Sequence, residues 1–331
     1  MSAQPNDTKL TNSKRTPALD LPDEELGQSI TTSTVGRDFV EDATITALGY
    51  TPAYRRVLGA FANFCVVLSL ASPLGAIIVS GHYQVYHAGY WGLSWGWIIP
   101  NVMMLPLVLA ICELCSSMPV NAGFYWWAAA LAPPKLSRPI AFITGWCNVL
   151  ALSTSLAAFA YAVAAGFTEN IVSAKEGLTF TNAQVMGVAI GIVTLWASLM
   201  LLRLENVSIL MIITATFLVT TSIGFIIALP ITHSQLGLPF ASAADVFGKF
   251  TNYSSWHETA IAVPLCFYSA LFVNTVWMSP AYIAEETHNA RVETPKAMLQ
   301  SFIATAVIGL GICLAFAFCI NDMSAIAHDR R

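Results

Sequence analysis

Charged residues are scarce in this sequence: they make up 10% of its 331 residues, whereas 56% are hydrophobic. The mean hydropathy is +0.64. A soluble globule of this length needs far more polar surface, so the composition argues against an ordinary soluble protein. The chain also lacks a basic block, and its net charge of −4 is small, which argues against nucleic acid as a partner. The composition therefore predicts a polytopic, all-α membrane protein with the lipid bilayer as its surroundings.

The patterns that catalysis and metal binding require are missing as well. The six histidines form no H-E-x-x-H pair, and no Gly-Xaa-Gly-Asp or nucleophile-elbow pattern occurs. The seven cysteines lie in apolar segments, where we expect reduced packing residues, and no second Cys or His pair complements Cys112 and Cys115 as metal ligands. We therefore predict no enzyme, no metal and no cofactor. Interfacial solvation is expected for four histidines near the outer span ends (82, 87, 233 and 257).

The first 50 residues differ in composition from the rest of the chain. Ser, Thr, Asp, Pro and Lys dominate there, no apolar period is visible, and no basic segment precedes an apolar one as in a signal peptide. We predict a disordered cytosolic tail over 1–50, a transmembrane domain over 51–320 and a short terminal tail over 321–331.

Long apolar runs fill the remainder of the sequence. A membrane-crossing helix needs about 20 apolar residues, and by that measure seven spans are expected, near 57–80, 95–117, 140–167, 184–202, 207–230, 258–284 and 298–320. With the tail in the cytosol, eleven Lys and Arg residues fall on the cytosolic side against four elsewhere. This asymmetry predicts a cytosolic N-terminus, the reverse of a seven-helix receptor, which is the rival interpretation of seven spans.

Two of the expected spans are interrupted by helix-breaking residues. The first contains Ser72, Pro73 and Gly75 in the middle of its apolar run, and the sixth contains Pro264, Asn274, Ser279 and Pro280. Non-helical backbone at membrane depth is tolerated only where it is buried in protein or lines a polar cavity. Two broken helices five spans apart indicate an inverted-repeat transporter with its substrate near the midplane. A simple kink is the alternative.

Three motifs resemble those of a known superfamily. They read ELCSSMPVNAGFYWW at 113–127, TGWCN at 144–148 and AEETHNARVETPKA at 284–297. In order and spacing they are similar to the amino acid, polyamine and organocation permeases, in particular to the fungal branch that carries amino acids, 4-aminobutyrate and choline.

This resemblance implies a fold and a function. The fold is a partial leucine-transporter-like inverted repeat, with about seven of an expected 12 transmembrane helices, so that the permease domain over 51–320 looks truncated at its C-terminus. The implied function is secondary active transport of an amino acid or related amine, with protons as coupling ion, across a plasma or vacuolar membrane. A non-transporting remnant, or a partner of a full-length permease, remains the alternative.

The resemblance also implies a substrate site between the first and sixth spans. Freed N–H groups of the first span would hold a carboxylate, and the sixth span would face an ammonium group, with the third span contributing Asn148 or Tyr161. The expected substrate-binding residues are Ser72, Pro73, Leu74, Gly75, Ala76, Asn148, Val276, Trp277, Met278 and Ser279.

Some residues depart from the pattern of the superfamily. Val276 stands where glycine is usual, and Met278 where an acidic residue is frequent; a methionine beside Trp277 suggests contact of a bulky or quaternary ligand with the aromatic face. The segment 206–230 lacks the lysine that some relatives use in proton coupling. We expect Glu113 to anchor the segment after it, and Glu285 and Glu286 to form a structural helix exit close to bulk water.

Overall fold

The computed structural model of the protein describes residues 46, 54–175, 179–202, 204–256 and 258–328. Nearly all of the predicted tail over 1–50 lies outside these residues, as does His257. The described ranges are helical and contain an isolated β-bridge but no named strand. This confirms the prediction of an all-α protein.

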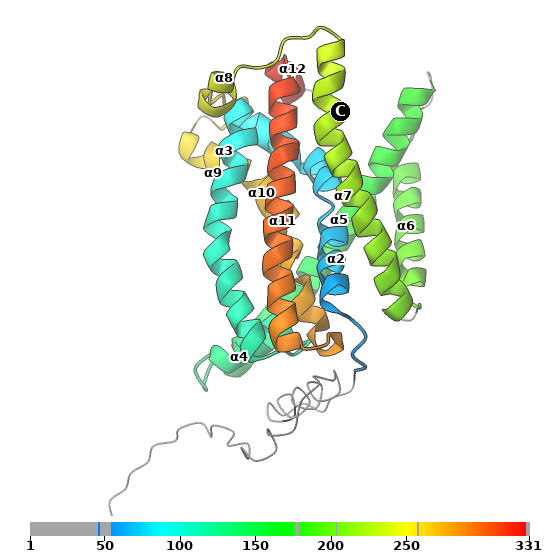
Figure 1. Ribbon diagram of the computed structural model, residues 1–331, viewed down its shortest axis with the longest axis vertical. Coiled ribbons are helices and arrows are strands. Elements are labelled where there is room, and N and C mark those ends of the chain that lie inside the picture. The colour runs from blue at the N-terminus through cyan, green and yellow to red at the C-terminus, as the bar shows by residue number, and fades with distance from the viewer. Residues whose placement is uncertain (1–45, 47–53, 176–178, 203, 257, 329–331) are drawn as a thin grey trace, which may run out of the picture.

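The helices form an upright bundle, with α4 at one end and α8 and α12 at the other (Figure 1). The first half of the chain contributes α2 (Ala60–Ala71), α3 (Pro73–Ser117), α4 (Gly123–Leu131), α5 (Ser137–Ala174), α6 (Asn182–Leu199) and α7 (Leu204–Gln235). The second half contributes α8 (Ala243–Gly248), α9 (Thr259–Cys266), α10 (Tyr268–Asn274), the 3₁₀-helix η2 (Thr275–Glu286), α11 (Ala290–Cys319) and α12 (Met323–His328).

Six helical stretches of the described chain are long and apolar enough to cross a membrane, which confirms a polytopic membrane protein. The sequence predicted seven spans, and the first two are merged in one stretch of 58 residues from Ala60 to Ser117. Gly89 accounts for the difference, because its φ of 59° and ψ of −134° turn the chain sharply inside α3. A Cβ atom at Gly92 would lie only 2.2 Å from the Gln84 carbonyl oxygen across this turn. Where the sequence predicted a loop after residue 80, the structure has helix with a sharp bend.

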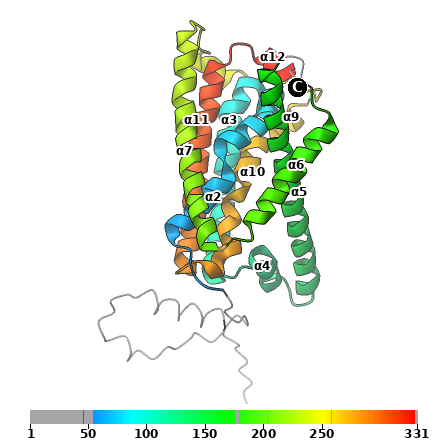
Figure 2. The same ribbon diagram turned by 90° about the vertical axis from the view of Figure 1, so that its right-hand side faces the viewer.

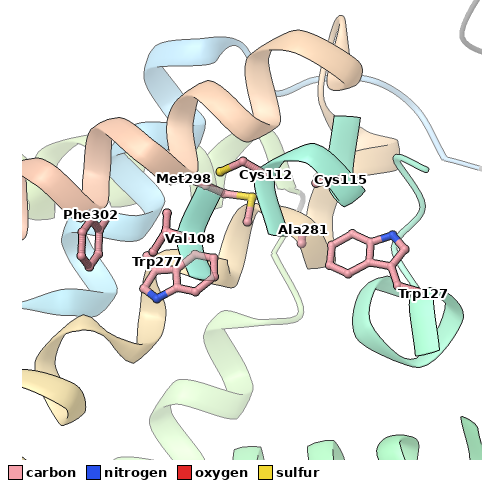
Figure 3. Close-up of a cluster of buried hydrophobic side chains, with 8 residues drawn as sticks. All are labelled: Val108, Cys112, Cys115, Trp127, Trp277, Ala281, Met298 and Phe302. Carbon is pink, nitrogen blue, oxygen red and sulfur yellow. The ribbon is translucent and has the colours of Figure 1, made fainter. Parts of the chain in front are cut away.

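The centre of the bundle is built on α11, which packs against α2, α3, α7 and η2. One buried cluster joins α3, α4, η2 and α11 near the α4 end, and Figure 3 shows its eight members: Val108, Cys112, Cys115, Trp127, Trp277, Ala281, Met298 and Phe302. A second cluster, farther from α4, joins α3, on both sides of its bend at Gly89, to α10 and α11. Its members are Ala76, Ile77, Trp97, Ala270, Val273, Ile312 and Cys313. These two clusters fix the elements that surround both interruptions.

The hairpin of α5 and α6 lies at the edge of the bundle (Figures 1 and 2). These two helices pack on each other, and α5 also packs on α4, where the Ser137 hydroxyl donates to the Ala129 carbonyl at 2.7 Å. Many large apolar side chains of α5 and α6 are exposed, among them Phe142, Ile143 and Leu195. Apolar side chains of this kind can face lipid tails, so this exposed apolar surface is consistent with a membrane protein.

Candidate functional site

The first interruption lies between α2 and α3, at the point that the sequence predicted. Ser72 has a φ of 36° and a ψ of 62°, in the left-handed region that residues other than glycine seldom occupy. Its N–H donates to the Leu68 carbonyl at 3.1 Å and ends α2, and its carbonyl accepts from the Ala76 N–H at 2.9 Å and begins α3. Pro73 is suited to the first helical position, because an N–H there would have no intrahelical partner.

The start of α3 provides the chemistry expected at this interruption. A helix leaves its first N–H groups without acceptors in the same helix, and it carries a partial positive charge at that end. In α3 these groups belong to Leu74, which is half-buried, and Gly75, which is exposed. Ala76 is buried and its N–H is already bonded to Ser72. The break can therefore offer two backbone donors to an anionic group.

The second interruption is a change of helix type. The sixth stretch consists of α9 and α10, separated by a turn at Phe267, and after Asn274 it continues as the 3₁₀-helix η2 for 12 residues. Runs of 3₁₀-helix longer than three or four residues are uncommon and often mark a hinge or strain. Pro280 lies within η2, and Ile283 leaves helical angles altogether (φ −123°, ψ 22°). The unwinding expected around Val276 is thus a tightened helix that begins at Thr275.

The two interruptions face each other across the bundle. The helix before the first break, α2, packs against η2, which follows the second. The helix after the first break, α3, places Ala76 and Ile77 in one cluster with Ala270 and Val273 of α10, which precedes the second. The break between α2 and α3 therefore lies opposite the change from α10 to η2. We call this place the paired junction.

The predicted residues of η2 and α5 have different surroundings. Trp277 is buried beside side chains of α3 and α11, so its ring is part of the core (Figure 3). Met278 packs at the edge of the same cluster, and its sulfur lies 3.9 Å from the Tyr282 hydroxyl. That hydroxyl donates to the Asn148 Oδ1 at 2.9 Å, so Tyr282 brings Asn148 and Met278 together.

The remaining predicted residues lie at the margin of the junction. Val276 is half-buried, and its carbonyl accepts a hydrogen bond from the Ser279 hydroxyl at 2.7 Å. Tyr161, the other candidate on α5, is exposed. Farther along α5, Phe159 contacts Phe272 of α10, with ring centroids 5.1 Å apart.

Sequence reasoning missed a pair of buried amides at the junction. Asn274, the last residue of α10, donates from its Nδ2 to the Asn101 Oδ1 of α3 at 2.6 Å. Asn101 in turn donates to the Trp97 carbonyl at 2.8 Å. A polar amide inside an apolar run was the available signal, because such groups are costly in a membrane unless they are paired or functional.

The end of the bundle near α4 is closed by hydrogen bonds between distant segments. The N–H groups of Val57 and Leu58 donate to the Glu286 carbonyl, both at 3.0 Å, and the His288 N–H donates to the Leu58 carbonyl at 3.0 Å. Glu285 accepts from the Asn121 N–H at 2.9 Å, and its own N–H donates to the Asn121 Oδ1 at 2.8 Å. These contacts tie the end of η2 to the chain before α2 and to the loop before α4.

Three expectations about polar residues need correction. Glu285 is buried, although its position in the sequence placed it close to bulk water. Glu113 is exposed on α3, and within the described residues no hydrogen bond or ion pair of its side chain anchors the segment that follows. His87 and His233 are buried rather than solvated, the former against the rings of Tyr83 and Tyr86.

The junction therefore offers backbone dipoles, hydroxyls and amides. In the described part of the chain no group of three or more His, Cys, Asp or Glu side chains lies close enough together to hold a metal ion. The arrangement can bind a small polar molecule by hydrogen bonds and by the field of a helix end.

Comparison with known proteins points in the same direction. Residues 58–330 match the model of a family described as amino acid permease. An uncharacterized amino-acid permease of Schizosaccharomyces pombe is 26% identical over 293 residues, covering 87% of this chain and 53% of the relative. Amino-acid permease 2 of Neurospora crassa is 25% identical over 285 residues (85% of this chain, 52% of the relative), and amino-acid permease BAT1 of Arabidopsis thaliana is 23% identical over 289 residues (85% and 55%).

The chain spans about half the length of the curated relatives that it matches. No solved structure matches it. The family match nevertheless covers most of the sequence, including α2 to α12 and both interruptions. The chain belongs to the amino acid permease family.

Proposed function

We propose that this protein carries an amino acid or a related amine, such as 4-aminobutyrate or choline, across a membrane by alternating access. The observation that carries the proposal is the paired junction, where the break at Ser72 lies opposite the change from α- to 3₁₀-helix after Asn274. Membrane transporters built on broken helices bind their substrates at such points, because the interrupted backbone provides polar groups at membrane depth.

The chemistry of the junction suits a zwitterion or a neutral amine derivative. The N–H groups of Leu74 and Gly75 provide donors for a carboxylate at the positive end of α3. Ser72, Pro73 and Ala76 shape the same break. On the other side, Val276, Met278 and Ser279 of η2, with Asn148 of α5, provide carbonyl, thioether, hydroxyl and amide groups for the amine end. Trp277 supports this wall from the core.

The amide and hydroxyl chemistry of the site sets the expected substrate range. The predicted residues include no acidic side chain, so a lone cation such as choline lacks a counter-charge there. Within the proposed substrate class, a zwitterion such as 4-aminobutyrate is therefore preferred over choline. We propose the proton as coupling ion and a cytosolic N-terminus, in a plasma or vacuolar membrane, on the strength of the family and of the Lys and Arg distribution.

Uptake by cells that lack their own permeases tests the proposal. Two forms would be expressed: the 331-residue chain, and any longer product that its gene encodes. A radiolabelled panel of neutral and basic amino acids, 4-aminobutyrate, choline and polyamines would be offered at two external pH values. We expect uptake of at least one zwitterionic substrate, and faster uptake at the lower external pH.

The outcomes separate the alternatives. Uptake by the short form shows that the chain suffices alone or after assembly, whereas uptake by a longer form alone assigns transport to that product. If both forms reach the membrane in amounts comparable to a working permease and neither takes up any member of the panel, the proposed function is wrong. The non-transporting interpretation then replaces it.

A further inference from the structure

The buried amides of Asn101 and Asn274 occupy the point where the sixth stretch changes from α- to 3₁₀-helix. Asn274 is 1% exposed and Asn101 is 8% exposed, and the hydrogen bond between them, at 2.6 Å, is made across two elements. Asn274 is the last residue of α10 and occupies the position directly before η2, where its side chain bonds to α3 and not to the η2 backbone. A contact to this side chain therefore acts on the junction itself.

Asn101, the partner of Asn274, is held in place by contacts within α3 and between α3 and α11. The Asn101 Nδ2 donates to the Trp97 carbonyl one turn earlier in α3, at 2.8 Å. The Trp97 ring nitrogen donates to the Ala306 carbonyl of α11 at 2.9 Å. The ring lies so close to α11 that a Cβ atom at Gly309 would be 2.1 Å from it. The position of Asn101 is thus set by the tight packing of α3 on α11.

The amide pair is also the polar layer between two apolar clusters. The cluster of Trp97 and Val273 lies on one side of it, and the cluster of Val108 and Trp277 lies on the other. In such surroundings an amide that loses its partner has no water to replace it, so the pair is strongly favoured over separated amides. The Asn274 Oδ1 already lacks a partner among the described residues, which leaves its Nδ2 as the bonded half of the side chain.

We propose that Asn101 is a positioning residue for transport: it holds Asn274 and thereby fixes where η2 begins and how its residues are presented to the substrate. This inference rests on the proposed function, and it adds two residues that touch the junction from the core side. Because Thr275 to Ser279 follow directly after Asn274, a shift of the starting point of η2 would rotate every group of the η2 wall relative to α3.

Kinetics of three variants test the proposal. Asn101→Leu, Asn274→Leu and the double variant would be compared with the parent by initial uptake rates, normalised to protein in the membrane. We expect KM to rise at least about tenfold in either single variant, because η2 is then no longer held in the arrangement that binds substrate and the free energy of a buried hydrogen bond is of that order. The double variant should be no worse than either single one, since both remove the same hydrogen bond. Asn101→Thr keeps an oxygen that can accept from Asn274 and a hydroxyl that can donate to the Trp97 carbonyl four residues earlier, so it should restore most of the affinity.

The matched control is Ser222→Ala on α7. Ser222 is also fully buried, and its hydroxyl bonds to the Leu218 carbonyl of its own helix, so its loss removes a buried polar group away from the junction. We expect unchanged KM. Additive effects of the two leucine substitutions, or an Asn101→Thr variant as poor as Asn101→Leu, would overturn the positioning role.

A second readout does not depend on transport. The reaction of Ser279→Cys with a thiol reagent in isolated membranes reports how η2 is presented. The parent chain, in which Cys147 is exposed and Cys319 is half-buried, gives the background labelling. We expect Asn101→Leu to raise the labelling rate of this cysteine several-fold and Ser222→Ala to leave it unchanged. Equal labelling in all three backgrounds would refute the positioning role even if the chain transports nothing. Altered labelling in Asn101→Leu, together with a parent chain that takes up no substrate, would refute only the proposed function.

Discussion

The centre of the bundle and its edge solve the same problem, the placement of apolar helices in a membrane, in different ways. In α11, 39% of the most apolar window is buried, against 11% in α5 and in α6. The central helices are joined by interlocked side chains and by hydrogen bonds between elements, such as that from Trp97 to Ala306. The edge hairpin is mostly self-contained. The helices that contain the interruptions are therefore held in place by many contacts, whereas the edge helices are held by few.

This difference has a functional meaning. Both interruptions lie among the central elements, and the groups at the paired junction depend on where α3, η2 and α11 hold them. The hairpin reaches the same region through Asn148, which accepts from Tyr282, and through the contact of Phe159 with Phe272. We therefore expect substitutions in the centre to change stability and substrate handling together, and substitutions at the edge, other than at these contact residues, to change neither by much.

The largest effect should follow from truncation of a central side chain. Met298 of α11 is 0% exposed and lies in the cluster of Trp277 and Trp127. Met298→Ala removes these contacts and should lower the free energy of unfolding by about 2 to 5 kcal/mol. Met186→Ala on α6 is the matched change at a side chain that is 53% exposed. Thermal loss of monodisperse protein in detergent would compare the two, and equal losses would remove the distinction between centre and edge.

Insertion of a single methyl group should have the next largest effect. At Gly309 a Cβ atom would meet the Trp97 ring at 2.1 Å, whereas at Gly191 of α6 nothing lies within 4 Å. Gly309→Ala should cost about 1 to 3 kcal/mol, because the ring is held in a packed core. Gly191→Ala should be neutral or slightly stabilising, since alanine favours the helix. The same melting assay measures the stability of both variants. A Gly309→Ala variant as stable as the parent would show that α3 and α11 can move apart without cost.

A smaller effect is expected at the closed end of the bundle. Glu285→Ala leaves the Asn121 N–H without its buried acceptor and should cost about 1 to 2 kcal/mol. Glu285→Gln keeps an accepting oxygen and should cost less. Glu169→Ala, at an exposed acidic residue of α5, is the control. Protease sensitivity of the loop before α4, which contains Asn121, should rise in the alanine variant alone. A rise in all three variants would mean that charge and not this contact protects the loop.

The smallest effect should come from the link between centre and edge. Tyr282→Phe removes the hydroxyl that donates to Asn148 and should cost about 1 kcal/mol. Tyr161→Phe changes an exposed ring on α5 and should cost nothing measurable. Because Asn148 belongs to the proposed site, uptake by Tyr282→Phe should fall about fivefold, in line with that loss. Unchanged uptake would place Asn148 outside the site.

Much of the fold could be predicted from the sequence because its signals are local. Apolar runs of membrane length and the Ser72–Pro73–Gly75 pattern each mark a feature within a few residues, and both the helices and the first break are present. The merged first stretch was missed because a single glycine, Gly89, allows the sharp turn inside α3. The length of an apolar run does not reveal such a turn.

The candidate site was less accessible to sequence reasoning, since it depends on contacts between distant residues. Asn101 and Asn274 are 173 positions apart, and neither carries a sign of its partner. The roles of two acids were also exchanged: Glu113 seemed the anchor, but Glu285 is the buried acid, because the turn at Asn121 comes to lie beside the end of η2. Trp277 looked like a ligand contact, and only the packing of α3 and α11 around it shows it to be part of the core.

Protection of an introduced cysteine by substrate would test the account most directly. Gly75→Cys places a thiol at the start of α3, where a Cβ atom meets only the Ser72 hydroxyl at 3.1 Å, and Gly191→Cys places one at the edge. Labelling of both would be followed in membranes with and without each member of the amino acid and amine panel. The account predicts that a transported zwitterion slows labelling at position 75 and leaves position 191 unaffected. Equal labelling at position 75 with and without every transported substrate would contradict the claim that the paired junction binds the substrate.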